Sequence, residues 1–338
     1  MRKEASPEQW GELYASALEL LSLEPWGYFW DMDLVAVRPD PDGEPAFCSI
    51  MGRIGSCYGI GVYPGEDGLC DLQMIADLSS GPLSAEYMMH EQSSLCCYLG
   101  DREEVPPPQY KIIRSLGLKF RGRGKWVYFQ SFKRRYSPCT PDEAEVLLLT
   151  GVFRGLIAAV KAVAAGQIAA GFSEGRILWQ EFDRKTGWNL HEGELPDVQK
   201  RYPVASIRDD LLKQRLKKQP CNGSELLLDF CYMNVSIEDP SFDRPANPLL
   251  FLAIDSRSGM VVDTRLLTPD SDETDEALDF FISYVMEFGR MKSIRARNPW
   301  IFGALDEICS HCSIPLLMDP LTAVDKFLKD FQRQMIGR

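Results

Sequence analysis

The order of strand-like and helix-like segments in the last third of the chain restricts its fold more than any other sequence feature. Three apolar runs typical of strands come first, at residues 226–235, 249–254 and 260–267. Helices and strands then alternate, with helices expected at 275–288, 300–311 and 321–334 and strands at 293–296 and 314–318. The order is βββαβαβα. Its alternating second half predicts parallel crossovers and a sheet with helices packed against it.

The first two hundred residues mix helices and strands in a less regular order. Ser6-Pro7 and Thr140-Pro141 are each typical of a helix start, with Gln9 and Glu143 as capping partners. We expect strands at 33–37, 46–51, 59–63 and 125–132, a helix at 84–99, and a hairpin that begins with 176–182. Residues 201–224 are charged and broken by Pro and Gly. The sequence therefore predicts an N-terminal α+β domain at 1–200, a linker at 201–223 and a C-terminal α/β domain at 224–338.

Two stretches of the C-terminal domain resemble known proteins. Residues 251–255 (FLAID), a turn and residues 260–263 (MVVD) resemble the opening hairpin of the ribonuclease-H-like fold, whose element order is also βββαβαβα. Residues 248–331, through LAID, SIRARN and CSIP, resemble a bacterial family of two-domain proteins of unknown function, and residues 8–65 resemble its N-terminal domain. The resemblance implies a ribonuclease-H-like C-terminal domain in a bacterial protein, and it brings no known activity.

Composition is typical of a folded protein in a reducing compartment. Hydrophobic residues make up 45% of the chain and charged residues 25%. The N-terminus lacks the apolar stretch of a signal peptide, and ten cysteines in 338 residues are too few for a disulfide scaffold, so we expect a cytoplasmic protein. The apolar stretch at 146–170 contains Arg154 and Lys161, which favours a buried core helix over a membrane span.

Charge is distributed unevenly along the chain. Residues 1–100 hold 4 Lys or Arg against 16 Asp or Glu, which accounts for the whole net charge of −12, whereas the rest of the chain holds 33 of each sign. Within that rest, residues 119–135 contain seven basic residues and no acidic one. This separation indicates surfaces with different partners.

The basic segment is the candidate binding site. The residues expected to take part in it are Arg121, Arg123, Lys125, Trp126, Lys133, Arg134 and Arg135. Cations contact phosphates and flat rings stack on bases, so nucleic acid is one candidate partner, provided that the charges face one way. An acidic protein is another. A third interpretation is a solvated hairpin whose cations pair with the acidic N-terminal surface.

Metal-dependent nuclease chemistry is the catalytic alternative. It needs three or four carboxylates that converge on two divalent ions. Asp255 matches the position of the first such carboxylate in the ribonuclease-H-like fold, but Asn298 stands where a later strand would supply another. With a four-residue loop at 256–259, Asp255 and Asp263 are expected on opposite faces of the sheet. Asp255 is better explained as the residue that starts the turn.

The sequence contains no motif for a cofactor or a metal. Cys309 and Cys312 form a single CxxC, whereas a structural zinc site needs four ligands, so we expect both thiols in a helix core. A nucleophile elbow and a phosphate-binding loop are also missing from the sequence. The sequence therefore favours a non-catalytic binding or regulatory protein. The alternatives are a divalent-metal nuclease and an interaction module that binds proteins through its acidic N-terminal domain.

Overall fold

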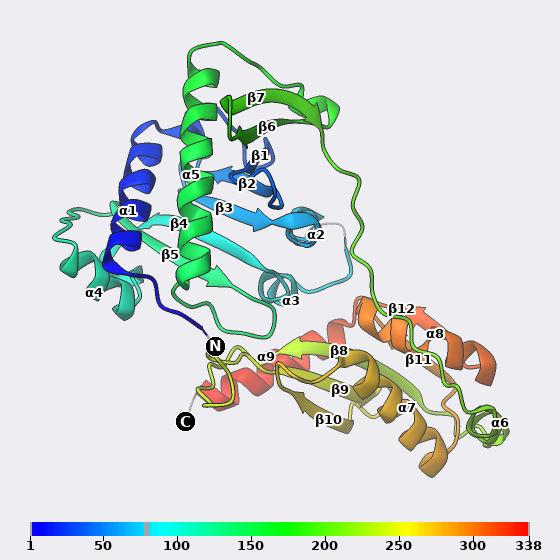
Figure 1. The fold of residues 1–338 in the computed structure, drawn as a ribbon. Helices are drawn as coiled ribbons and strands as arrows, with labels where there is room; N and C mark the ends of the chain where they lie inside the picture. Colours follow the sequence, from blue (N-terminus) through cyan, green and yellow to red (C-terminus); the bar gives the residue numbers. More distant parts are fainter. Residues whose placement is uncertain (1, 78–80, 337–338) are drawn as a thin grey trace. The chain divides into compact units, whose positions relative to one another are not determined.

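The computed structural model describes residues 2–77 and 81–336, which form two compact units (Figure 1). The first unit holds the residues up to Met74 together with Glu91–Arg134 and Pro138–Lys200. The second holds Ile75–His90, Arg135–Ser137 and the residues from Arg201 onwards. Residues 201–223, which we expect to be a linker, thus belong to the second unit, and helix α6 (Asp210–Lys218) forms within them.

A seven-stranded sheet forms the first unit, in the order β5-β4-β3-β2-β1-β6-β7. Strands β1 and β6 are parallel, and every other neighbouring pair is antiparallel. The predicted hairpin is confirmed by β6 and β7, which Arg184, Lys185 and Thr186 connect. The strands are β1 Val35–Arg38, β2 Ala46–Met51, β3 Gly59–Pro64, β4 Ser94–Gly100, β5 Trp126–Phe132, β6 Arg176–Asp183 and β7 Gly187–Glu194.

Helices α1 (Pro7–Ser22) and α5 (Glu143–Ala164) cover one face of this sheet (Figure 1). The predicted capping box of α1 is present, because Ser6 Oγ accepts the Gln9 N–H and Gln9 Oε1 accepts the Ser6 N–H. The N-cap of α5 is Asp142, two residues after Thr140, and its capping partner is Glu145, so the predicted cap at Thr140 with Glu143 is wrong. Asp142 and Glu145 cap each other's N–H groups at 3.0 and 2.9 Å.

Helix α5 approaches the sheet closely enough to require glycine at position 155. A Cβ atom there would lie 2.5 Å from Val37 Cγ1 and 2.9 Å from the Trp188 ring. Within residues 2–77 and 81–336, α5 is the helix whose length and composition would allow a membrane crossing. Ten of its residues are nevertheless buried within the unit, which is what we expect of a core helix.

The prediction of one helix over residues 84–99 is wrong. The structure has a short helix, α3 (Ala85–His90), followed by strand β4. β4 lies between β3 and β5 in the sheet. The side chains of Cys96 and Cys97 face opposite sides of the strand and both are buried, so both of its faces are covered. A strand buried on both faces shows no alternation of polar and apolar residues. Its apolar run therefore cannot be told from a buried helix by periodicity.

The second unit has the predicted βββαβαβα order and a five-stranded sheet in the order β10-β9-β8-β11-β12. This is a ribonuclease-H-like fold, as expected. β8, β11 and β12 are parallel, and β9 and β10 run antiparallel to their neighbours. The elements are β8 Glu225–Tyr232, β9 Leu249–Asp255, β10 Val261–Leu267, α7 Glu273–Phe288, β11 Ser293–Ala296, α8 Pro299–Cys312, β12 Leu316–Met318 and α9 Thr322–Ile336.

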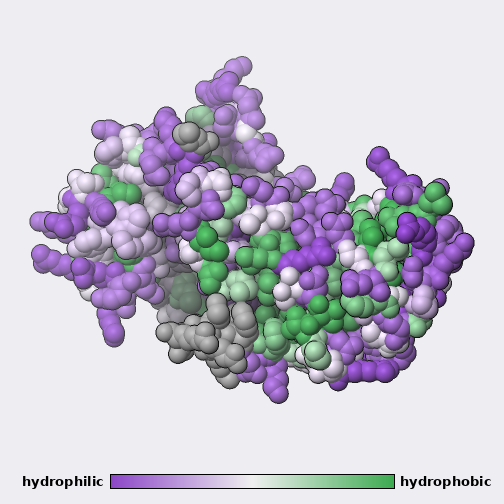
Figure 2. All heavy atoms as spheres, turned by 90° about the horizontal axis from the view of Figure 1, so that it is seen from below, coloured by the Kyte–Doolittle hydropathy of each residue, from purple (hydrophilic) through white to green (hydrophobic). Residues whose placement is uncertain are grey.

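The two faces of this sheet are covered by different helices. On one face Phe251 stacks on Phe280 of α7, with ring centroids 5.1 Å apart. On the other face, Leu227 and Leu252 share an apolar cluster with Leu321 and Val324, beside and within α9. Cys309 and Cys312 are buried on α8, as expected for core residues. In Figure 2, hydrophobic residues form a connected region on the face drawn, and hydrophilic side chains project around it.

Two segments from the first half of the sequence complete the second unit. On α3, Tyr87 lies 5.7 Å from the Tyr232 ring of β8. The Ser137 N–H donates to the Pro245 carbonyl at 2.8 Å, and the Asn247 N–H donates to the Arg135 carbonyl at 2.9 Å. The second unit is therefore built from three separate stretches of sequence.

Candidate functional site

The central strands of the ribonuclease-H-like sheet carry a buried charged cluster. Asp229 lies in the middle of β8, and Arg297 directly follows β11. Because Ala296 pairs with Leu228 in the parallel β8–β11 ladder, the next residue, Arg297, comes opposite Asp229. Asp325 reaches the same guanidinium from the first turn of α9 (residues 322–336). These three side chains form the Asp229–Arg297–Asp325 cluster.

Arg297 binds both carboxylates at hydrogen-bonding distance. Its Nε donates to Asp229 Oδ2 at 2.8 Å, while its two Nη atoms donate to the Asp325 carboxylate at 2.6 and 3.2 Å and to the Pro320 carbonyl at 3.0 Å. The Asp229 and Arg297 side chains are only 1% and 4% exposed. Burial raises the pKa of Asp229 to about 6, although the nearby arginine opposes that shift.

This cluster does not fit a divalent cation. A two-metal site needs several carboxylates whose oxygens converge on open space, whereas here the Arg297 guanidinium occupies the position between the two carboxylates. Among residues 2–77 and 81–336, no three His, Cys, Asp or Glu side chains gather where they could hold a metal ion. Arg297 instead pairs with both carboxylates, and the cluster anchors α9 to the sheet.

Asp255, the carboxylate singled out from the sequence, lies at the end of β9, the second strand of the fold. The opening strand of the fold is β8, which carries Asp229 in its middle, and Asp255 belongs to the strand that follows it. Asp255 Oδ1 accepts hydrogen bonds from the Ser258 N–H and Oγ, both at 2.8 Å. These bonds lower the pKa of Asp255. The residue starts the turn, as the sequence suggested.

The expected register of β9 and β10 is also wrong. A β-bulge between Val261 and Asp263 shifts the ladder, so that Asp263 pairs with Ala253 and not with Leu252. Paired residues share a face, and so do residues two apart in a strand, so Asp255 and Asp263 lie on the same face of the sheet. Asp263 is engaged there by Arg265 at 3.1 Å.

The basic segment predicted from the sequence is divided by strand β5. Arg121, Arg123 and Lys125 precede the strand, and Lys133 and Arg134 follow it. At about 3.3 Å per residue, the seven residues of β5 separate these two groups by roughly 20 Å. The segment therefore does not present one continuous surface.

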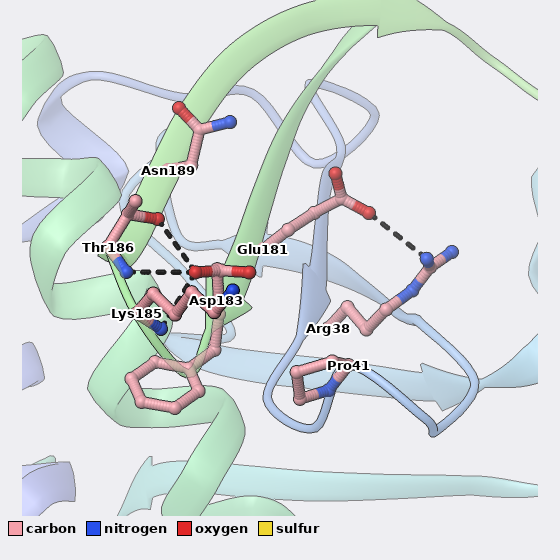
Figure 3. A pocket seen from close by; sticks show the side chains of 8 residues that line it. Arg38, Pro41, Glu181, Asp183, Lys185, Thr186 and Asn189 are labelled. Carbon is pink, nitrogen blue, oxygen red and sulfur yellow. Dashed lines mark hydrogen bonds and ion pairs between the residues drawn. The ribbon is translucent and has the colours of Figure 1, made fainter.

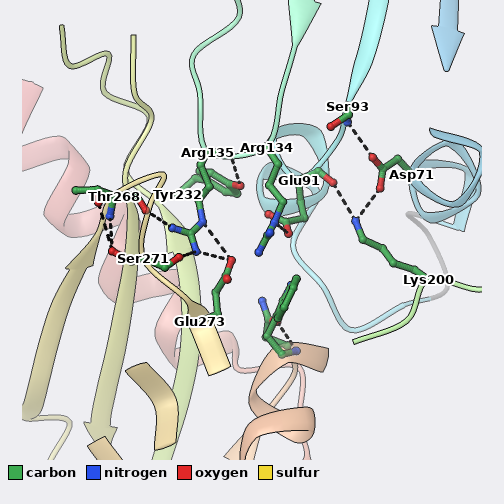
Figure 4. Close-up of polar contacts among 12 residues, drawn as sticks. Asp71, Glu91, Ser93, Arg134, Arg135, Lys200, Tyr232, Thr268, Ser271 and Glu273 are labelled. Carbon is green, nitrogen blue, oxygen red and sulfur yellow. Dashed lines mark hydrogen bonds and ion pairs between the residues drawn. The ribbon is translucent and has the colours of Figure 1, made fainter. Parts of the chain in front are cut away.

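Two of the cations after β5, Arg134 and Arg135, form ion pairs with carboxylates (Figure 4). Arg134 forms an ion pair with the buried Glu91 in the first unit. Arg135 is itself buried and belongs to the second unit, where its Nε donates to Glu273 Oε1 at 3.1 Å. Its Nη atoms donate to the Thr268 and Ser271 carbonyls at 2.6 and 3.3 Å. The structure thus gives both arginines an internal role.

A second internal pair of the first unit lies beside Arg134. Lys200 Nζ donates to Asp71 Oδ1 at 2.7 Å, and Asp71 Oδ2 accepts the Ser93 N–H at 2.8 Å (Figure 4). Burial raises the pKa of Asp71 against the opposing effect of Lys200. These contacts fix the end of the first unit's last segment to helix α2 (Gly65–Ala76).

The cations before β5 lie on a well-ordered loop. Helix α4 (Pro107–Ser115) leads into residues 116–125, where Leu118 and Phe120 pack against the core cluster. Trp126 lies 5.7 Å from Phe120 and 6.0 Å from Tyr110, ring to ring. The Gly124 N–H donates to Asp101 Oδ1 at 2.6 Å. Trp126 is therefore part of the support of the loop and not a free stacking ring.

The residues that alternate with these apolar anchors point to solvent. Six exposed cations result, two from α4 and four from the loop, and we call them the α4–β5 basic surface: Lys111, Arg114, Lys119, Arg121, Arg123 and Lys125. Arg123 has a 97% exposed side chain and lies 3.9 Å from Asp101. The sequence named three of the six as site residues, Arg121, Arg123 and Lys125, and Lys119 lies within its basic segment. Lys111 and Arg114 were missed because they precede the basic segment, although their i, i+3 spacing places them on one side of a helix.

A pocket of about 520 Å³ lies at the end of the β6–β7 hairpin (Figure 3). Arg38, Glu181, Asp183 and Asn189 are among the residues that line it. Arg38 Nη1 lies 3.2 Å from Glu181 Oε1, and Asp183 accepts the N–H groups of the hairpin turn, which lower its pKa. Arg38, Glu181 and Asp183 are thus already engaged in contacts that stabilise the hairpin.

Comparison with known proteins identifies domains but no activity. Residues 10–180 match the domain of unknown function DUF7309, and residues 212–332 match the domain of unknown function DUF6930. No curated protein matches the chain.

Two solved structures are similar to part of the chain. The catalytic core domain of BIV integrase aligns at 13% identity and a TM-score of 0.23, over 33% of this chain and 65% of its own. The simian T-cell lymphotropic virus intasome in complex with PP2A regulatory subunit B56 gamma aligns at 16% identity and a TM-score of 0.25, over 41% and 44%. This chain spans less than two thirds of either, and similarities this distant do not indicate function.

Proposed function

Because the chain belongs to the family of the domain of unknown function DUF7309, no activity can be inherited from its relatives, and we propose a function from geometry. The protein is a non-catalytic binding protein that contacts the phosphate backbone of nucleic acid through the α4–β5 basic surface. The observation that carries the proposal is the gathering of six exposed cations on one helix and the loop that follows it.

The electrostatics of this surface favour phosphate contacts. Lysine and arginine side chains that point to solvent release counterions from nucleic acid when they bind it, and this release supplies most of the sequence-independent affinity. The packed rings of Phe120 and Trp126 hold the loop in place, so binding costs little conformational entropy of the loop. Since the rings are occupied, we expect contacts to phosphates and not base stacking.

The Asp229–Arg297–Asp325 cluster supports the non-catalytic part of the proposal. Asp229, the buried aspartate in the opening strand of the sheet, is already paired with Arg297. Asp255 is committed to its turn through Ser258. The ribonuclease-H-like unit would then act as a folded scaffold.

The test is fluorescence anisotropy with labelled 20-nucleotide single strands and 20-base-pair duplexes at low and moderate salt. We expect salt-sensitive binding that weakens when Arg121→Ala and Arg123→Ala are combined. The matched control is Arg184→Ala with Lys185→Ala, which removes two exposed cations from the β6–β7 turn. Equal affinity of wild type and the 121/123 variant, or no binding at low salt, would overturn the proposal.

A further inference from the structure

An exposed aromatic surface lies on the first unit, on loop 24–33 and the turn at 52–58. Tyr28, Trp30, Met32 and Ile54 are 45%, 53%, 48% and 76% exposed. Large apolar side chains that remain in water gain nothing from folding, and a connected group of them is typical of an interaction site. We call these four residues the aromatic surface.

The loop that carries the surface is held firmly. Pro25 and Phe29 are buried and anchor it, so the side chains on either side of Phe29 point outwards. The Trp30 N–H donates to Asp33 Oδ2 at 2.8 Å, and the Ser49 hydroxyl donates to the Asp31 carbonyl at 2.7 Å. The short helix η1 (Pro25–Gly27) fixes the entry of the loop. The exposed rings are therefore presented by an ordered backbone.

The turn at 52–58 is joined to this loop. Arg53 Nη1 donates to the Gly27 carbonyl at 3.0 Å, and its guanidinium lies 4.7 Å from the centre of the Trp30 ring. Trp26 packs edge-on against Tyr58, with centroids 4.8 Å apart. These contacts bring Ile54 and Trp30 to the same part of the unit. Trp, Tyr and Arg are also the residue types most enriched at the centres of protein interfaces.

The charges around the surface indicate the chemistry of its partner. Glu24 and Asp31 are exposed beside the rings, and Arg53 is the one basic residue in the two segments. The first hundred residues, which contain the surface, carry an excess of twelve acidic side chains. Phosphate would be repelled here, whereas Lys or Arg side chains would be attracted, and a ring already beside one guanidinium can accept others.

We infer that the aromatic surface is a docking site for a short apolar peptide segment that carries Lys or Arg, supplied by a partner protein. The apolar side chains of the segment would cover Trp30, Tyr28 and Ile54, and its cations would face Glu24 and Asp31. This site is independent of the proposed nucleic-acid contact, which uses the α4–β5 basic surface.

The test is selection of random 12-residue peptides displayed on phage against the full chain, with wild type and Trp30→Ala selected in parallel. We expect wild type to enrich peptides that combine apolar and basic residues. Synthetic copies should bind Trp30→Ala at least tenfold more weakly, with Trp30→Phe restoring part of the affinity. Replacing the peptide lysines by glutamate should cost at least tenfold at low salt. Leu211→Ala, an exposed apolar residue on α6, is the control that should bind as wild type.

Several results would overturn the inference. Peptides that bind Trp30→Ala and wild type equally, acidic peptides, or no enrichment at all would remove it. Self-association of the wild type that Trp30→Ala abolishes would assign the surface to a second copy of the chain. Nucleic-acid binding lost in Trp30→Ala would assign it to nucleic acid. Tyr28→Ala serves as the second variant, and thermal unfolding of each variant distinguishes loss of the site from loss of the fold.

Discussion

Arg297 and Asp229 form an ion pair inside the second unit, with the guanidinium Nε 2.8 Å from the carboxylate Oδ2. Asp229 lies in β8 and Arg297 directly follows the neighbouring strand β11, and Asp325 on α9 binds the same guanidinium. One cation thus joins the middle of the sheet to the last helix. A buried charge is tolerated only while it is paired, so the second unit is especially sensitive to substitution here.

Replacing Arg297 by methionine should destabilise the second unit by about 3–5 kcal/mol, because Asp229 is then left buried without a counter-charge. Arg295→Met is the control. Arg295 is 43% exposed and pairs with Asp319 at the surface, so its loss should cost no more than about 1 kcal/mol. Urea unfolding followed by hydrogen exchange of second-unit peptides measures both. Equal costs for the two variants would contradict a central role for Arg297.

The pKa of Asp229, raised to about 6 from an ordinary 3.8, predicts a pH dependence of stability. Between about pH 4 and pH 6 the folded protein keeps a proton that the unfolded chain has released. The free energy of unfolding should therefore fall as the pH rises through this window, by up to about 3 kcal/mol for this group. Urea unfolding at pH 4 to 7 should show a weaker fall in Asp229→Asn. The same slope in both proteins would disprove the assignment.

Arg135→Met should destabilise the second unit by about 3 kcal/mol, since Glu273 loses its buried partner and two carbonyls lose their donor. Lys133→Met changes an exposed cation two residues away and should cost less than about 0.5 kcal/mol. Hydrogen exchange of peptides from α7 reports the difference. If Lys133→Met were as costly as Arg135→Met, the effect would not come from burial.

Gly155→Ala should destabilise the first unit by about 1–3 kcal/mol, because the new methyl group overlaps Val37 and Trp188. Gly11→Ala in α1 should have the opposite sign. Its Cβ would meet its nearest neighbour, Leu116 Cδ2, at an ordinary 3.8 Å, and alanine favours a helix over glycine by up to about 1 kcal/mol. Thermal unfolding of the two variants decides the point, and a Gly155→Ala variant that is as stable as wild type would refute the close approach of α5.

The salt dependence of nucleic-acid binding counts the phosphate contacts. Each contact contributes about 0.9 to the slope of log K against log salt on a duplex, so Arg121→Ala with Arg123→Ala should reduce the slope by nearly 2. Trp126→Leu should leave the salt slope unchanged, because Trp126 contacts no phosphate, and any change in affinity should come from a less stable loop. A slope unaffected by the double substitution would place the contacts elsewhere on the protein.

The ribonuclease-H-like order could be predicted from the sequence because each helix and strand there has a clear local signal. Asp272 caps α7, Gly289 ends it, and the short strands between helices are plainly apolar. The bulge beside Asp263 could not be read, because it depends on one extra residue in β10 and not on composition. The helix expected at 84–99 failed because a strand buried on both faces has no distinctive period.

The charged sites were harder to predict, because a cation's partner is set by the tertiary fold. The seven basic residues of the basic segment look alike in sequence. Arg134 nevertheless binds Glu91 in the first unit and Arg135 binds Glu273 in the second. Arg121 and Arg123 remain exposed. One signal was available and overlooked. Asp229 interrupts an otherwise apolar strand, and a carboxylate in such a place needs a buried partner.

The discontinuous make-up of the second unit has a consequence for how the chain folds during synthesis. Residues 75–90 and 135–137 leave the ribosome well before residue 201 and everything after it. At typical rates of translation, α3 would wait on the order of 10 s for strand β8 to appear. Tyr87 and Arg135 are then without their native surroundings, while the first unit can already close around Lys200. A nascent chain of this protein therefore passes through a stage in which one unit is complete and carries unsatisfied pieces of the other.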